Sequence, residues 1–224
     1  MSTISRLSLT ALLLIAACDP PAPTPAPTPT AAPAAPVAPP AAAVAAPAPA
    51  AGAPALDPAQ AAAVDRAKAA AKVFAGALKQ ELGAAVAAGG PPAGVEACVD
   101  AAPRQTAAQG AAAGVKLGRS ALRLRSPANR GPDWVQAGLQ AWGERKHEGV
   151  QPQISVHTDD QGEVVRVLLP IAVEAQCTAC HGDRAAQPPA LQAALAAKYP
   201  ADQAVGFAPG DLRGGLWVEA PVLR

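Results

Sequence analysis

A proline-rich segment near the N-terminus limits how much of this 224-residue chain can form a globular domain. Of the 26 prolines, 13 lie between Pro20 and Pro54, where most of the other residues are alanine and threonine. Because this segment has almost no large apolar side chains to bury, it cannot offset the entropy cost of ordering. We therefore expect residues 18–55 to be a disordered tether and residues 56–224 to form one domain with its own core.

The residues before the tether have the pattern of a bacterial export signal. Arg6 precedes an apolar run, Leu7–Ile15, that is shorter than the about 20 residues needed to span a bilayer. The run ends in Leu14-Ile15-Ala16-Ala17-Cys18, which is similar to a lipobox, although an ordinary signal peptide can also contain a cysteine. We expect cleavage of residues 1–17, a lipid on Cys18 and a location on the periplasmic face of a bacterial membrane. Asp19 favours the inner membrane by the enterobacterial sorting rule.

Charge and periodicity exclude one class of partner and indicate the fold class. The formal net charge is +1 with no basic stripe, so we expect no binding of nucleic acid. Helical spacing predicts a long helix over residues 57–88, ended by the Gly-Gly-Pro-Pro sequence at 89–92, and a shorter helix over 94–102 closed by Pro103. The expected later elements are an irregular stretch from 118 to 131, helices at 132–145 and 189–198, and strands at 153–158, 163–173 and 214–222. Residues 159–162 form a hairpin turn between the first two strands, and Trp134 and Trp142 face inward. This order predicts an α+β domain with a long N-terminal helix and an antiparallel sheet.

One motif in this domain indicates a specific chemistry. Cys177-Thr178-Ala179-Cys180-His181 has the spacing of a c-type haem attachment site. Two residues between the cysteines let both thiols reach the vinyl groups on one porphyrin edge, and the adjacent histidine can bind the iron. The alternatives are a disulfide between Cys177 and Cys180, or a zinc site, which requires four well-spaced ligands. We expect one covalently bound haem c, held by the two cysteines and His181.

Cys98 is the only cysteine without a role once the other three are assigned. It can be a buried and inert thiol, which is a common fate of cysteine, or a sulfur ligand on the distal face of the iron. His147 and His157 compete for that position. His147 lies in a run of charged residues and His157 near the hairpin turn, where a surface position is expected for each.

Several short motifs together resemble a known family. The residues that carry the resemblance are Ala97-Cys98, Ala102-Pro103, Gly118-Arg119-Ser120, Arg125 to Asn129, Trp134, Cys177 to Gly182, Tyr199 to Phe207 and Gly210 to Gly214. From about Ala61 to Pro221 the chain resembles the bacterial c-type haem proteins with a PAS-like fold, long known as a domain of unknown function. The resemblance implies a PAS-like haem domain and His/Cys axial ligation, with Cys98 as the second protein ligand of the iron. Ser126 and Gln136 depart from the family pattern, which usually has asparagine and an acidic residue there.

These expectations leave three classes of function open. A haem with both axial positions filled by protein side chains suits one-electron transfer or redox sensing, and a thiolate ligand would lower its potential. A gas or small-ligand sensor would release Cys98 on reduction and signal to a separate protein. A peroxidase-like enzyme, which we favour least, requires an open iron. We therefore expect a membrane-anchored protein with a redox or signalling partner, and favour this over an enzyme.

Overall fold

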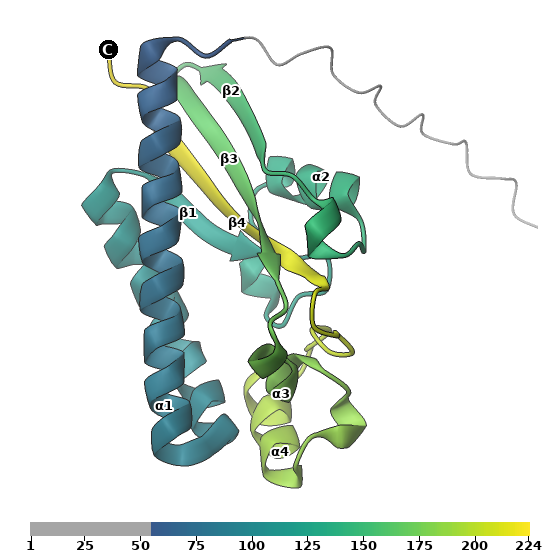
Figure 1. Ribbon diagram of the computed structural model, residues 1–224. Helices are drawn as coiled ribbons and strands as arrows, with labels where there is room; N and C mark the ends of the chain where they lie inside the picture. Colours follow the sequence, from purple (N-terminus) through teal and green to yellow (C-terminus); the bar gives the residue numbers. More distant parts are fainter. Residues whose placement is uncertain (1–54) are drawn as a thin grey trace, which may run out of the picture. The chain divides into compact units, whose positions relative to one another are not determined.

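The computed structural model describes residues 55–224, which form an α+β domain (Figure 1). The expected signal peptide and nearly all of the expected tether lie outside the described residues. In chain order the elements are α1 (Pro58–Ala113), β1 (Lys116–Ser120), η1 (Pro127–Asn129), α2 (Asp133–Trp142), η2 (His147–Gly149), β2 (Gln153–Asp159), β3 (Gly162–Ala172), η3 (Ala175–Cys177), α3 (Thr178–His181), η4 (Arg184–Ala186), α4 (Pro189–Lys198) and β4 (Leu212–Pro221). None of the helices in residues 55–224 is both long enough and apolar enough to cross a membrane.

Helix α1 begins at the expected cap, and at Gly89 and Gly90, where we expected it to end, it bends instead. The Asp57 side chain accepts a hydrogen bond from the Gln60 backbone N–H (2.8 Å), and the Gln60 side chain accepts one from the Asp57 backbone N–H (3.0 Å). These two bonds form a capping box that satisfies otherwise unpaired N–H groups. At the bend, Gly89 and Gly90 leave the helical conformation, and Gly90 has a φ of 72°, which glycine adopts without steric strain.

The bend folds α1 into two antiparallel halves (Figure 1). The halves approach so closely at Gly94 that a Cβ there would lie 2.6 Å from Val86 Cγ2. The second half continues through Pro103 to Ala113, so the expected end of this helix at Pro103 is wrong. Proline removes one helical hydrogen bond, but the residues before it, 101–102, are buried against the rest of the core and hold the helix in place.

The four strands form one antiparallel sheet in the order β1-β4-β3-β2. The expected hairpin between β2 and β3 and the expected final strand are present. Strand β1 was not expected, because Gly118–Ser120 were assigned to an irregular stretch. β1 is five residues long, and Leu117 is its only large apolar residue, so it lacks the alternating pattern of a half-buried strand. Its pairing with β4, with Arg119 opposite Leu216, holds it in the sheet.

The sheet is covered on both faces. One face packs against α1 through a cluster that includes Phe74, Val167 and Val218. The other face packs against α2 through a second cluster, which includes Leu139 and Trp142 of α2 and Leu168 of β3. Trp142 is buried as expected, whereas Trp134 is only partly buried. The confirmed fold class is therefore α+β, with a long N-terminal helix packed on a four-stranded antiparallel sheet.

One end of the sheet collects the segments that matter for the site. β3 ends there at Ala172, which pairs with Leu212 at the start of β4. β1 also ends there, because Ser120 pairs with Gly215. The chain leaves β3 at this end and enters α3 and α4, and α4 packs beside α1 (Figure 1).

Candidate functional site

The expected haem motif forms a compact helical turn just after β3. Cys177 ends η3, and Thr178–His181 forms the single turn of α3. The Thr178 hydroxyl donates to the Ala175 carbonyl (2.7 Å), and the Gly182 N–H donates to the Thr178 carbonyl (2.8 Å). A Cβ at Gly182 would lie 2.6 Å from that carbonyl oxygen, so the turn requires a glycine after the histidine.

The sulfur atoms of this turn are available for chemistry. Cys177 and Cys180 are both free thiols and both half-buried, and their helical spacing places them on one side of the turn. Cys177 packs against the cluster of Val173, Ala204 and Phe207. Burial raises the pKa of the Cys180 thiol. The structure contains no disulfide between the two cysteines, so both remain free to form other bonds.

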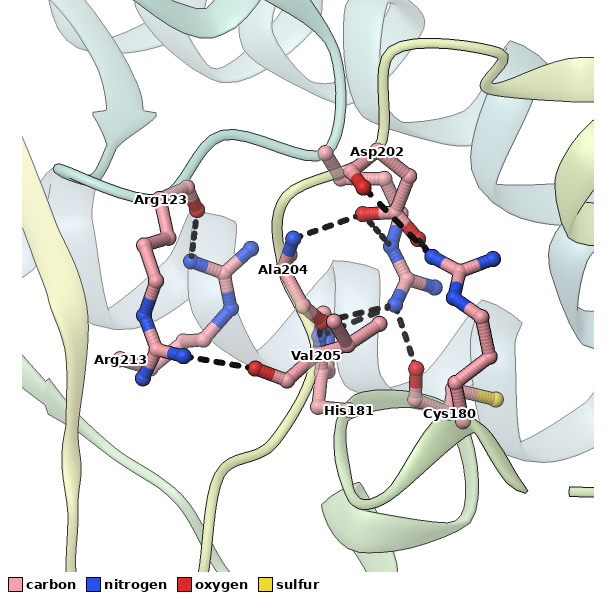
Figure 2. A network of polar contacts seen from close by, with 9 residues as sticks. Arg123, Cys180, His181, Asp202, Ala204, Val205 and Arg213 are labelled. Carbon is pink, nitrogen blue, oxygen red and sulfur yellow. Dashed lines mark hydrogen bonds and ion pairs between the residues drawn. The ribbon is translucent and has the colours of Figure 1, made fainter. Parts of the chain in front are cut away.

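The loop before β4 fixes the orientation of the His181 ring (Figure 2). His181 Nδ1 lies 2.8 Å from the Ala204 carbonyl oxygen and 3.1 Å from Arg125 Nη2. Because the carbonyl is the nearer partner and can only accept, we assign Nδ1–H as the donor to Ala204. The backbone supports this pairing, because the Phe207 N–H donates to the His181 carbonyl (2.9 Å). Burial, followed by the charges of Arg125 and Arg213, lowers the pKa of His181 to about 3. The ring is therefore neutral, and Nε2 is the nitrogen left without this hydrogen bond.

Arg125 and Asp202 hold the groups that surround His181. The Arg125 guanidinium donates to the carbonyl oxygens of Cys180 and Ala204. Its Nε lies 3.4 Å from Asp202 Oδ1, and the Asp202 side chain is only 1% exposed. Arg184 Nη2 lies 3.1 Å from the other Asp202 oxygen, and the Ala204 N–H donates to Oδ1 (2.8 Å). One buried carboxylate thus fixes both the arginine and the loop that orients the histidine (Figure 2).

The second half of α1 brings Cys98 to the same region. Cys98 is a half-buried free thiol. Val95, one turn earlier, packs against Leu191 and Leu195 in a cluster that Cys180 also contacts. The charge of Cys98 is one cause of the raised pKa of Cys180, after burial. The fold therefore places Cys98 within electrostatic reach of the motif, although the two are 79 residues apart.

This donor set fits a haem better than a bare metal ion. Residues 55–224 contain no group of three or more His, Cys, Asp or Glu side chains that could hold a metal ion. A haem supplies four nitrogen ligands of its own and needs only axial ligands from the protein. His181 offers a neutral, oriented imidazole beside two free thiols, and Cys98 offers a further sulfur. The residues present fit a covalently attached haem.

Comparison with known proteins gives the family. The sequence matches the Tll0287-like family over residues 55–221. The chain belongs to the Tll0287-like family. The crystal structure of the cyanobacterial haem protein Tll0287 is similar to this one, with a TM-score of 0.51 and 23% sequence identity, over 75% of this chain and 99% of that chain. At this identity the likeness shows a shared fold. No functionally curated protein matches the sequence.

The Tll0287-like fold separates one competing histidine from the site. His157 pairs with Val164 near the start of β3, whereas the motif follows the end of that strand. The eight residue-to-residue steps from Val164 to Ala172 correspond to about 26 Å of strand, so His157 and His181 lie far apart. His147 lies in η2, where its backbone N–H donates to the Gly210 carbonyl (2.9 Å). It is half-buried, where we expected it to be solvated.

The sequence alone did not identify Asp202 or Ala204 as functional residues in this Tll0287-like domain. Ala204 acts through its backbone, and no side-chain pattern can reveal a carbonyl acceptor. Asp202 was noted only as part of a matching segment. A local signal was available, because an aspartate oxygen that accepts the backbone N–H two residues later, as Asp202 does from Ala204, forms an Asx turn. Its pairing with Arg125, 77 residues earlier, required the tertiary structure.

Proposed function

We propose that this domain binds one haem covalently through Cys177 and Cys180, with His181 as an axial ligand of the iron. The observation that carries the proposal is the His181 ring, held neutral and with Nδ1 bonded to the Ala204 carbonyl, on the same turn as two free thiols. A backbone acceptor on Nδ1 orients the ring and makes Nε2 a better ligand. The similar cyanobacterial protein is itself a haem protein, which supports the proposal.

Cys98 is the proposed second axial ligand. It lies on α1, a different element from the motif, so ligation by Cys98 and His181 would clamp the haem between the second half of α1 and α3. A negatively charged thiolate favours Fe(III) over Fe(II) and lowers the potential. A haem with both axial positions occupied by side chains has no open site for a substrate.

The proposed role is therefore one-electron transfer or redox sensing at the periplasmic face of a bacterial membrane. The haem supplies the one-electron chemistry. The chain contributes orientation by Ala204, buried charge from Arg125 and Asp202, and a sulfur ligand from Cys98. A lipid on Cys18 would hold the domain at the membrane, close to a redox or signalling protein partner.

One structural observation favours a second candidate, a small-ligand sensor. Cys98 lies beyond the Gly89–Gly90 bend, where the backbone leaves the helical conformation. Movement at this bend would shift Cys98 together with Val95, which packs against Leu191 and Leu195. Release of Cys98 on reduction would open the iron to a diatomic ligand.

A pyridine haemochrome assay on protein produced with a c-type haem maturation system tests the proposal. We expect one haem per chain that resists extraction by acidified acetone. Cys177→Ser and Cys180→Ser should each leave a single thioether and shift the haemochrome band, whereas Cys98→Ser should retain both thioethers. Haem that is fully extracted from the wild-type protein would refute covalent attachment.

A further inference from the structure

Arginines gather around His181 without enough carboxylates to neutralise them. Arg125 pairs with Asp202 at 3.4 Å, and Arg123 pairs with Glu144 at 3.2 Å. Within residues 55–224, neither Arg119 nor Arg213 forms an ion pair. Asp202 is already shared between Arg125 and Arg184, so it cannot fully compensate either of them.

The sheet topology brings Arg119 and Arg213 to the same end of the sheet as the motif. Arg119 is the penultimate residue of β1, and Arg213 is the second residue of β4. β1 ends and β4 begins at the sheet end where β3 leads into α3. Both arginines lie close enough to His181 that their charges lower its pKa, after burial and Arg125.

Two contacts position the Arg213 side chain near the histidine. Its Nη1 donates to the Arg123 carbonyl (3.0 Å), and its guanidinium carbon lies 5.2 Å from the centre of the Phe207 ring. Phe207 in turn packs edge-on against His181, with ring centres 6.3 Å apart. Figure 2 shows Arg213 on the opposite side of His181 from Cys180.

This environment disfavours the charge that Arg213 carries. Burial, followed by the charges of Arg125 and Arg119, lowers the pKa of Arg213 to about 10. A half-buried cation surrounded by other cations is costly unless an anion pairs with it. No carboxylate in residues 55–224 forms an ion pair with Arg213, so a negatively charged group from outside the polypeptide would stabilise this site.

We propose that Arg119 and Arg213 bind the propionate carboxylates of the haem. The inference rests on the proposed function, because it requires the haem on Cys177 and Cys180. In a haem c the thioethers are on one edge of the porphyrin and the propionates on another, and Arg213 lies across His181 from Cys180. The planar guanidinium matches a carboxylate with two parallel hydrogen bonds.

The propionates would then fix how the haem is rotated and tilted on the motif. The two carboxylates would also compensate the two arginines that lack an ion pair. In return, the arginines would raise the potential, because positive charge near the ring favours Fe(II) over Fe(III).

Resonance Raman spectra and redox titrations of the haem-loaded protein test the inference. Arg119→Gln and Arg213→Gln should each lower the frequency of a propionate bending band, because a hydrogen bond is lost. Each should also lower the midpoint potential, with a change of about tenfold in the Fe(II)/Fe(III) ratio at fixed potential, equivalent to about 59 mV. Arg130→Gln is the matched control, since Arg130 is 59% exposed and pairs with Asp133; it should change neither value.

The outcomes separate this inference from the proposed function. A preparation without covalent haem overturns the proposed function and this inference with it. A haem-loaded protein whose propionate bands and potential are the same in wild type and both glutamine variants overturns this inference alone. If a glutamine variant cannot be produced in folded form, the spectra of the wild-type protein alone still test the inference. Its propionate bands should lie above those of the haem peptide released by proteolysis, and equal frequencies contradict propionate binding.

Discussion

His181 Nδ1 lies 2.8 Å from the carbonyl oxygen of Ala204, although 23 residues separate the two in the chain. This contact joins the haem motif to the loop before β4, and Asp202 fixes that loop by accepting the Ala204 N–H. The orientation of the proposed iron ligand therefore depends on a carboxylate that does not touch it.

Replacing Asp202 should destabilise the domain strongly. Asp202→Asn leaves Arg125 buried without its counter-charge, and breaking a buried pair in this way costs roughly 3 kcal/mol of unfolding free energy. Asp133→Asn is the control, because Asp133 is 92% exposed and its pair with Arg130 is worth less than about 1 kcal/mol. Urea unfolding of both variants measures the difference. Equal losses would show that the buried pair contributes no more than the exposed one.

The stability of the haem-free protein should depend on pH through His181. Burial lowers the pKa of His181 to about 3 in the folded state, against about 6.5 in the unfolded chain. Between these values the unfolded state binds more protons, so the unfolding free energy falls as the pH drops from about 6.5 towards 3. Urea unfolding of a Cys177→Ala/Cys180→Ala variant across this range measures the slope. Adding His181→Gln should flatten it, whereas adding His157→Gln should not.

Two glycines of α1 should respond to alanine in opposite directions. At Gly94 a Cβ would lie 2.6 Å from Val86 Cγ2, so Gly94→Ala should force the two halves apart and cost about 1–3 kcal/mol. At Gly76 a Cβ would meet nothing within 4 Å, so Gly76→Ala should stabilise the helix by about 0.5–1 kcal/mol. Thermal unfolding distinguishes the two signs. A stabilising Gly94→Ala would contradict the close approach of the halves.

Removing Cys98 should change the iron spectrum and the potential. In Cys98→Ala, loss of a negative ligand should raise the midpoint potential and open a position for carbon monoxide or cyanide. Electron paramagnetic resonance of the ferric protein should lose the low-spin signal of thiolate ligation. An unchanged spectrum would leave Cys98 as a packed thiol and His147 as the remaining candidate ligand. Tight carbon monoxide binding by wild-type ferrous protein would instead favour the sensor.

The sequence predicted the local features and missed those that depend on tertiary contacts. The Asp57 cap, the interruption of the helix at Gly89 and Gly90 and the β2–β3 hairpin follow from local rules, and the structure contains them all. β1 was missed because its charged and small residues carry no strand pattern. Pro103 was taken as a helix end because proline locally disfavours a helix. Packing of the buried residues before it maintains the helix.

The same division applies to the candidate site. The motif at Cys177, Cys180 and His181 is visible in the sequence because it occupies five consecutive residues. The carbonyl of Ala204 and the buried carboxylate of Asp202 are brought there by folding alone. Arg213 could not be singled out from the sequence, because only the folded structure shows that no carboxylate of the described residues lies close enough to pair with it.

Mass spectrometry of the peptide that contains the motif tests the central claim most directly. Trypsin digestion of protein purified from a host with c-type haem maturation should release the peptide from Val167 to Arg184, which contains Cys177, Cys180 and His181. We predict that this peptide carries the mass of one haem, with both cysteines as thioethers. A peptide with two free thiols or an internal disulfide, from cells that load other c-type proteins normally, would contradict the account.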